Sequence, residues 1–157
     1  MTAVRCSAPE AGARVVAAAR GWLGTPYRHQ ASCRGQGADC LGLIRGIWRE
    51  VVGPEPETVP AYGPDWAETG PDERLLTAAG RWLRPVAPGA DRPGDVLVFR
   101  MRTRGLAKHA AVLVDGRAAG PGRLIHAYSG HAVCETALSP AWARRLAGVF
   151  RLPGGTI

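Results

Sequence analysis

The sequence predicts an α+β fold in which N-terminal helices pack on a C-terminal antiparallel β-sheet of about five strands. Up to about residue 83, apolar side chains recur at helical spacing. From Gly94 onward, they form short valine-rich runs separated by turn signals. The chain has 157 residues, the length of one ordinary domain, and its sequence shows neither an internal repeat nor a linker. We therefore expect a single domain over residues 1–157.

Three segments have the apolar periodicity of helices. The first covers residues 10–23 and stops at Gly24, which is followed closely by proline. The second begins after Asp39, is the more apolar of the first two, and ends before a Gly-Pro pair. The third covers residues 72–83, within a stretch at 54–93 that is rich in proline and glycine. We interpret this stretch as an elaboration of the same domain.

Five short apolar runs in the second half of the chain predict strands. Turn signals separate them, such as Asp115-Gly116 and Ser129-Gly130. Because such short turns join neighbouring strands, we expect an antiparallel meander with the second helix packed on one face. The predicted strands cover residues 95–100, 109–114, 124–128, 132–135 and 149–152.

The formal net charge of +7 predicts attraction to anionic partners such as nucleic acid, membrane surfaces or an acidic cell-wall polymer. The densest basic run, residues 100–108, lacks interleaved aromatic residues, so we expect no specific nucleic-acid partner. No stretch approaches 18 apolar residues, and the start lacks the apolar core of a secretory signal. We therefore expect no membrane span and synthesis as a soluble cytoplasmic chain.

The chain has four cysteines, Cys6, Cys33, Cys40 and Cys134. A chain made without an export signal meets reducing conditions, so we expect free thiols. A zinc site built from His29, Cys33 and Cys40 is the alternative, but these residues are irregularly spaced and the sequence has no C-x2-C pair. We expect no metal and no cofactor.

One cysteine and two histidines have the positions that nucleophilic catalysis needs. Cys40 lies in the first turn of the second helix, where free N–H groups and the helix dipole favour a thiolate and could hold an oxyanion. His109 opens a strand, and His126 lies in the next one. Their antiparallel pairing predicts a relay in which His126 orients His109 as the base. As the alternative, His126 is a core residue bonded to a backbone carbonyl.

Five separated motifs resemble those of the NlpC/P60 family of cell-wall cysteine peptidases. They occur in the family's order and spacing from about residue 15 to residue 150. The motifs are GTPYR at 24–28, ADCLGL at 38–43, PGDVLVF at 93–99, KHAAV at 108–112 and LIHA at 124–127.

The resemblance implies a papain-like core and assigns roles to particular residues. It makes Cys40 the nucleophile, His109 the base and His126 the third polar residue. It also implies that Tyr27 lines the site near the oxyanion and that Asp39 engages the amino end of the substrate. From the residues alone, Tyr27 could instead pack against the second helix, and Asp39 could be only its N-cap. His29 and His131 have no motif support and are expected to be loop residues.

The resemblance also implies a reaction. Family members typically cut the bond between γ-D-glutamyl and diaminopimelate or lysine in peptidoglycan stem peptides. Many exported members have serine after the nucleophile, whereas this chain has Leu41. The form of the chain most resembles peptidases encoded among phage tail genes and by gene transfer agents. We therefore expect phage-like tail proteins as partners and action in the periplasm or cell wall, where the enzyme would aid DNA entry.

Two further readings stay open on the same scaffold. One is an N-acetylmuramoyl-L-alanine amidase or an acyltransferase. The other is a non-catalytic structural or binding protein of a tail tip. Cys40, His109 and His126 are all intact, which favours an enzyme.

Overall fold

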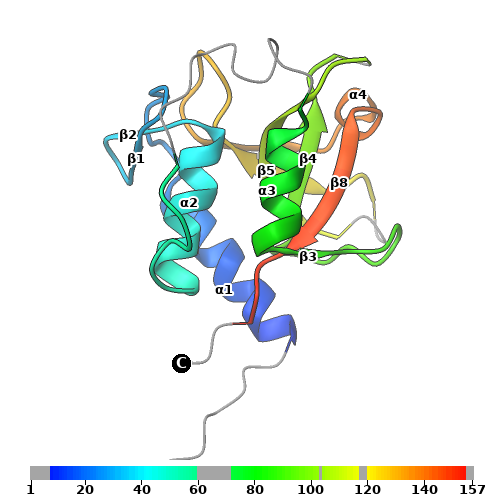
Figure 1. The fold of residues 1–157 in the computed structure, drawn as a ribbon, viewed down its shortest axis with the longest axis horizontal. Helices are drawn as coiled ribbons and strands as arrows, with labels where there is room; N and C mark the ends of the chain where they lie inside the picture. The colour runs from blue at the N-terminus through cyan, green and yellow to red at the C-terminus, as the bar shows by residue number, and fades with distance from the viewer. Residues whose placement is uncertain (1–7, 60–71, 103, 117–119, 155–157) are drawn as a thin grey trace, which may run out of the picture.

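A six-stranded antiparallel sheet forms the centre of the computed structural model, which describes residues 8–59, 72–102, 104–116 and 120–154. The strand order is β3-β8-β4-β5-β6-β7, and β1 and β2 form a separate hairpin (Figure 1). Along the chain the elements are α1 (Ala8–Gly21), β1 (Ser32–Cys33), β2 (Gly37–Ala38), α2 (Cys40–Val51), α3 (Arg74–Trp82), β3 (Arg84–Pro85), β4 (Val96–Arg100), β5 (Ala107–Asp115), β6 (Arg123–His126), β7 (Cys134–Ala137), α4 (Pro140–Ala143) and β8 (Leu146–Arg151).

The helix predictions are confirmed. α1 begins and ends two residues earlier than predicted, and α2 follows Asp39 directly. α3 lies within the predicted elaboration at 54–93, of which residues 60–71 are outside the described part of the chain. No helix among the described residues is long and apolar enough to cross a membrane.

The five predicted strands are present, but the prediction of a simple meander is wrong for the last one. β4 to β7 do follow each other through the sheet, whereas β8 pairs with β4 at the other end of this run. The chain reaches that position through α4, which Ser139 caps by accepting the N–H of Trp142 at 3.3 Å. The return of β8 gives β4 a hydrogen-bonded neighbour on its second side, so its backbone groups are paired there. The two-residue strands β1, β2 and β3 are too short to show a period in the sequence.

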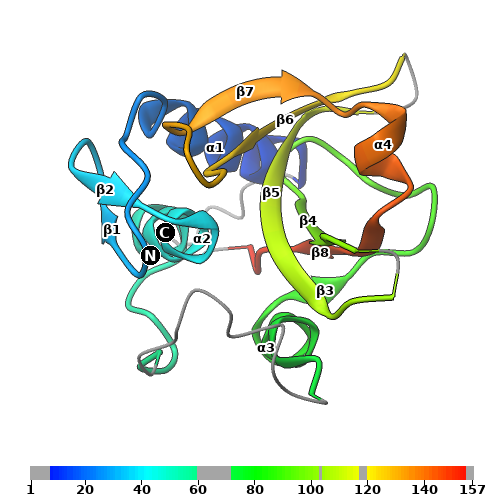
Figure 2. The same ribbon diagram turned by 90° about the horizontal axis from the view of Figure 1, so that it is seen from above.

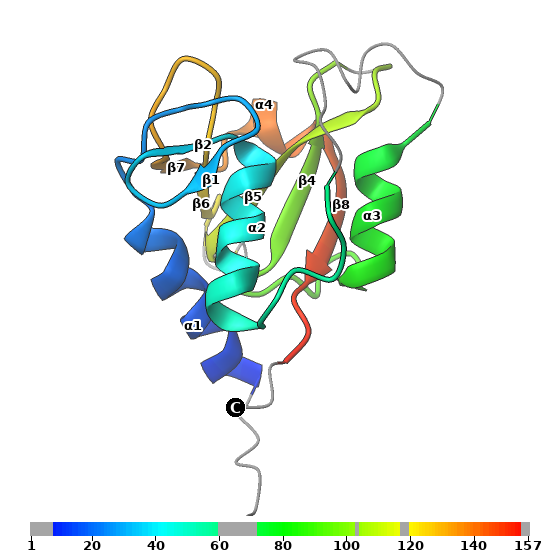
Figure 3. The same ribbon diagram turned by 60° about the vertical axis from the view of Figure 1, so that its left-hand side comes forward.

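Both faces of the sheet are buried. On β4, Val96 and Val98 join the core that α1, α2 and α3 cover, while Leu97 and Phe99 join a second core on the opposite face. Figure 3 shows α2 in front of β5 with α1 beside it. Figure 2 shows the sheet curving so that α4 lies on the opposite side of β5 from α2. The predicted packing of the second helix against one face is thus confirmed. On the other face, Trp142 of α4 packs against the second core.

A close contact between Trp22 and Gly46 sets the distance between α1 and α2. Trp22 follows α1 and is 1% exposed. A Cβ atom at Gly46 would lie 2.0 Å from Cζ2 of Trp22 and so could not be accommodated without moving the ring. Glycine at this position therefore lets α2 approach the indole closely, which helps to place the start of α2.

We expect Gly46→Ala and Gly80→Ala to change stability in opposite directions, although each replaces a glycine inside a helix. Overpacking a core typically costs 1–3 kcal/mol, so Gly46→Ala should lower the free energy of unfolding by about 1–3 kcal/mol. A Cβ at Gly80 on α3 meets nothing within 4 Å. Gly80→Ala should therefore gain up to about 1 kcal/mol from helix propensity. Urea unfolding of both variants checks this, and equal shifts would contradict the close contact.

Candidate active site

The N-cap of α2 holds Cys40 as the first residue of the helix. Asp39 has extended backbone angles and its Oδ1 accepts the N–H of Gly42 at 2.7 Å, which confirms the predicted N-cap. Its Oδ2 accepts the N–H of Gln30 at 2.8 Å. A Cβ at Gly42 would lie 1.8 Å from the carbonyl oxygen of Ala31, so only glycine fits against this loop. The loop before β1 and the start of α2 are thereby locked together beside the cysteine.

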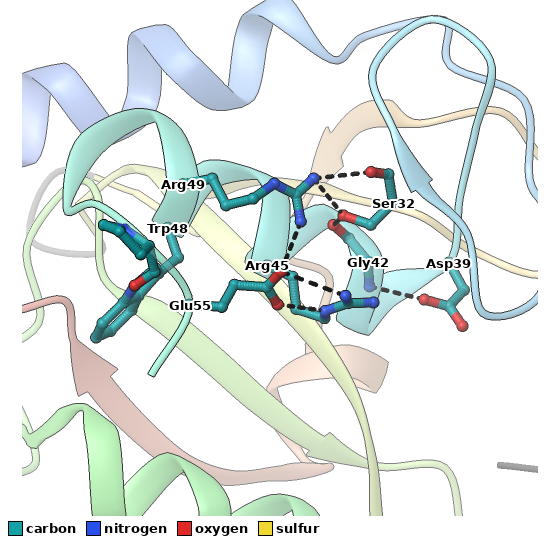
Figure 4. A network of polar contacts seen from close by, with 8 residues as sticks. Ser32, Asp39, Gly42, Arg45, Trp48, Arg49 and Glu55 are labelled. Carbon is teal, nitrogen blue, oxygen red and sulfur yellow. Dashed lines mark hydrogen bonds and ion pairs between the residues drawn. The ribbon is translucent and has the colours of Figure 1, made fainter. Parts of the chain in front are cut away.

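A polar network on the outer side of α2 supports the same arrangement (Figure 4). Ser32 Oγ donates to the carbonyl oxygen of Gly42 at 2.6 Å, and Arg49 Nη2 donates to Ser32 Oγ at 2.8 Å. Arg45 and Arg49 both bind the carboxylate of Glu55, which lies beyond the end of the helix. The network joins the hairpin, the helix and the segment that follows it, so the start of α2 is fixed from two sides.

Cys40 carries a neutral thiol in the resting protein, which corrects the expectation of a partly ionised one. Burial, followed by the charge of Asp39, raises the pKa of Cys40 to about 11. The backbone N–H groups of Ala110, Leu41 and Cys40 lower the pKa, but by less. The sulfur lies 3.7 Å from the carbonyl oxygen of Lys108, where a thiol can donate. Desolvation therefore outweighs the helix N-terminus, a balance that depends on packing and not on sequence position.

The two predicted relay histidines touch each other. His109 on β5 and His126 on β6 are 5% and 3% exposed, and His109 Nε2 lies 2.9 Å from His126 Nδ1. This contact uses Nε2 of His109, so Nδ1 is the ring nitrogen of His109 that does not face His126. His126 Nε2 lies 3.3 Å from the Thr136 hydroxyl, so both of its ring nitrogens contact side chains of the described residues. The predicted neighbourhood of His109 and His126 is confirmed.

Both rings are neutral at pH 7. Burial, reinforced by His126, lowers the pKa of His109 to about 3. Burial, reinforced by His131, lowers the pKa of His126 to about 4. Trp142 of α4 covers the pair, with ring centroids 5.2 Å from His109 and 5.4 Å from His126. A neutral imidazole that lines the same pocket as a neutral thiol can accept its proton when the sulfur attacks an electrophile.

We expect these neutral rings to make stability fall in acid. Below about pH 6.5 the unfolded chain binds protons that the folded rings take up only near their own pKa values of about 4 and about 3. The unfolded state then holds more protons, so the free energy of unfolding decreases as the pH falls from about 6.5 toward about 4, by up to about 1.4 kcal/mol per pH unit for each ring. His109→Gln should flatten this slope in urea titrations, whereas Thr77→Val on the exposed surface of α3 should not. An unchanged slope in His109→Gln would contradict the burial effect.

Four of the five predicted site residues line one pocket. They are Tyr27, Asp39, Cys40 and His109, and His126 stands behind His109. Tyr27 also packs against the core to which Leu43 and Ile47 of α2 belong. Burial, followed by the charges of Cys40 and Asp39, raises the pKa of Tyr27. The other residues that line this pocket are His29, Leu41, Met101, Lys108, Ala127, Tyr128 and Ser129.

The chain matches the model of the NlpC/P60 family over residues 24–151. It belongs to the NlpC/P60 family. Members of this family are cysteine peptidases and hydrolases of peptidoglycan. A curated relative, the gamma-DL-glutamyl hydrolase of Bacillus subtilis (strain 168), is 29% identical over 146 residues, which cover 91% of this chain and 30% of the relative.

Solved structures of the family share the fold. An NlpC/P60 family protein from Bacillus cereus matches with a TM-score of 0.61 at 22% identity, over 90% of this chain and 40% of that chain. The NlpC/p60 domain of the peptidoglycan hydrolase SagA matches with a TM-score of 0.57 at 20% identity, over 90% of this chain and 98% of that chain. These likenesses confirm the α+β fold of the NlpC/P60 family. The chain spans less than a third of the curated relative's length.

Sequence reasoning missed three side chains around the NlpC/P60 constellation. His29 was expected to be an ordinary loop residue, but its Nδ1 lies 3.8 Å from Asp39 Oδ2 and it lines the pocket. Its position two residues after Tyr27 is the signal that could have indicated it. Thr136 contacts His126, and Trp142 packs on both histidines. Neither could be found from spacing, since β7 and α4 reach the rings through tertiary packing.

Neither Cys33 nor Cys134 lines this pocket. Cys33 is exposed on β1, and Cys134 is a partly buried free thiol on β7. Cys6 is outside the described part of the chain. Within the described ranges, no group of three or more His, Cys, Asp or Glu side chains could hold a metal ion.

Proposed function

We propose that this chain is a cysteine endopeptidase that hydrolyses peptidoglycan stem peptides at a bond of the γ-D-glutamyl–diaminopimelate type. The observation that carries the proposal is one pocket lined by Cys40 and His109, with His126 bonded to the far nitrogen of His109. A nucleophile, a base and a group that orients the base are the parts that covalent amide hydrolysis needs.

The resting protonation states define the first step. Cys40 Sγ attacks the carbonyl carbon of the scissile amide while its proton moves to Nδ1 of His109. The carbonyl oxygen becomes an oxyanion, and the N–H groups of Cys40 and Leu41 at the start of α2 are the donors available to it. Formation of imidazolium at His109 is favoured because His126 Nδ1 can accept the Nε2–H.

The remaining steps restore the enzyme. His109 returns its proton to the leaving amine nitrogen, the C–N bond breaks, and a thioester to Cys40 remains. Water then attacks the thioester carbonyl and gives a proton to His109. The C–S bond breaks, the sulfur recovers that proton, and the free carboxylic acid leaves. No metal or cofactor takes part in this cycle.

Three observations support a γ-glutamyl substrate in the cell wall. The curated relative is named a gamma-DL-glutamyl hydrolase, and a structural neighbour is titled a peptidoglycan hydrolase. Asp39 is one of the residues that line the pocket, and its negative charge would attract the ammonium at the amino end of a stem peptide. The net charge of +7 favours approach to an anionic polymer.

We also propose that the protein acts from a phage-like tail, whose proteins would be its partners. The support for this is the Asp39-Cys40-Leu41-Gly42-Leu43 motif, which resembles that of tail-encoded peptidases, with Leu41 where many exported members have serine. Mass spectrometry of purified particles should find the chain in the tail fraction. A particle free of it would remove this part of the proposal and leave the hydrolase reaction in place.

Digestion of defined muropeptides separates the candidate functions. Two substrates are needed: the free stem tetrapeptide, which carries the ammonium that Asp39 would attract, and the disaccharide tetrapeptide, whose amino end is bonded to muramic acid. The free tetrapeptide should give L-alanyl-γ-D-glutamate and a dipeptide with a new free amine. An amidase would release the whole stem peptide, an acyltransferase would give transfer products, and a binding protein would give none. The Cys40→Ala protein serves as the matched blank. Absence of the glutamate-ended product with wild-type protein would overturn the proposed bond.

A further inference from the structure

Thr136 lies behind the histidine pair, on the side away from the thiol. It belongs to β7, the last strand of the sheet, and its hydroxyl oxygen lies 3.3 Å from His126 Nε2. In the β6–β7 register Thr136 is opposite Leu124, and Cys134 is opposite His126. The Thr136 side chain therefore reaches His126 diagonally across the strand pair. Together with the contact of 2.9 Å between the histidines, this forms a continuous chain of polar contacts from Thr136 to His109.

We propose that Thr136 is a positioning residue whose hydroxyl oxygen accepts the Nε2–H of His126, which keeps Nδ1 of His126 free to support the protonated ring of His109. The proposal rests on the proposed hydrolase mechanism. It adds a fourth group to Cys40, His109 and His126, one that touches neither the substrate nor the reacting atoms.

The argument follows from counting protons on the two rings. When His109 takes the thiol proton on Nδ1, its ring carries a proton on both nitrogens, so Nε2–H must donate to His126. Nδ1 of His126 must then be unprotonated, which places the proton of that neutral ring on Nε2. A buried N–H without an acceptor is costly. Thr136 Oγ1 is a side-chain oxygen in contact with this nitrogen, so it is placed to accept the Nε2–H in the charged intermediate.

The surroundings of His126 leave this role to Thr136. The ring is 3% exposed and lies between Trp142, 5.4 Å away, and Tyr128, 5.9 Å away, which offer stacked or edge-on aromatic contacts. His131 is close enough for its charge to affect His126, and its ring stacks on Tyr128. The titratable and charged groups that share a pocket with His126 and Thr136 are Tyr128, His131, Cys134 and Arg145.

Substitution of Thr136 by valine tests the proposal, because valine keeps the shape and removes the oxygen. We expect Thr136→Val to lower kcat for muropeptides about 10-fold with little change in KM, and Thr136→Ser to restore most of it. The acid limb of the pH–rate profile should move to lower pH in Thr136→Val, since a protonated histidine pair loses an acceptor. A merely structural role would leave the limb in place. Both variants keep the four titratable or charged residues that share a pocket with His126 and Thr136, so a shift of the acid limb can be assigned to the lost hydroxyl.

Two measurements do not depend on hydrolysis and so remain valid if the proposed function fails. The first is the rate at which iodoacetamide alkylates Cys40, followed by peptide mass spectrometry. It should fall about 10-fold in Thr136→Val and recover in Thr136→Ser, because alkylation also needs a proton acceptor. Thr77→Val on the exposed surface of α3 is the matched control and should react as wild type.

The second measurement is the ¹⁵N NMR spectrum of the histidine side chains in wild-type protein at neutral pH, which needs no variant to fold. His126 should carry its proton on Nε2. A proton on Nδ1 of His126, or wild-type alkylation and hydrolysis rates in a folded Thr136→Val protein, would overturn the role of Thr136. Normal alkylation chemistry without any muropeptide cleavage would instead count against the proposed substrate.

Discussion

The Cys40→Ala variant is expected to lose muropeptide hydrolysis by roughly 10⁴-fold or more, because the proposed reaction forms a bond to this sulfur. The fold should persist. Cys40 is partly exposed at the pocket, and the contact of its thiol with the Lys108 carbonyl oxygen is a long one of 3.7 Å. Rates of product formation, measured by mass, and thermal unfolding of the same samples check both parts.

Cys33→Ala is the matched control for this variant. Cys33 is an exposed free thiol on β1, so its loss removes a sulfur from the chain without touching the pocket. Its hydrolysis rate should equal that of the wild type. If Cys40→Ala kept more than a few per cent of wild-type activity, the nucleophile would have to be another group, and the mechanism built on α2 would be wrong.

The sequence was a good guide to the elements with strong periodicity. α1, α2 and α3 and the strands β4 to β8 are all present, and all of them except β7 contribute apolar residues to one or both cores. The position of β8 was not predictable, since its sequence fits any place in an antiparallel sheet. Pairing with β4 is decided by the path of the chain through α4, which is only four residues long.

The positions of the candidate site residues were predictable from the sequence, but their protonation states were not. Motif order was enough to bring Cys40 and His109 to one pocket and His126 next to His109. The protonation states were not, because desolvation depends on what surrounds each group. Sequence position alone indicates a helix N-terminus that favours thiolate, whereas burial raises the pKa of Cys40 to about 11. The family pattern thus locates the reacting groups, and packing decides that they rest as neutral partners.

His109→Gln is expected to lower kcat by about 10²–10⁴-fold, the usual contribution of a general base. Glutamine has an amide that can still bond to His126, so the pocket should stay filled between Phe99 and Trp142, whose ring centroids lie 6.1 Å and 5.2 Å from that of His109. KM should change little, because the ring acts on the thiol proton and the leaving amine. Steady-state kinetics on a defined muropeptide measure both constants.

The pH dependence of the His109→Gln rate also distinguishes a reaction that starts from a neutral Cys40 thiol from one that starts from a thiolate. With a neutral resting pair, the thiol keeps its proton until attack, so loss of the base should be partly recovered at high pH as the Cys40 thiol, with a pKa of about 11, begins to ionise. Thr77→Val, on the exposed surface of α3, should keep wild-type rates across the same range. A His109→Gln rate that stays flat from neutral to alkaline pH would contradict a neutral thiol, because the remaining attack would then not depend on ionisation of the sulfur.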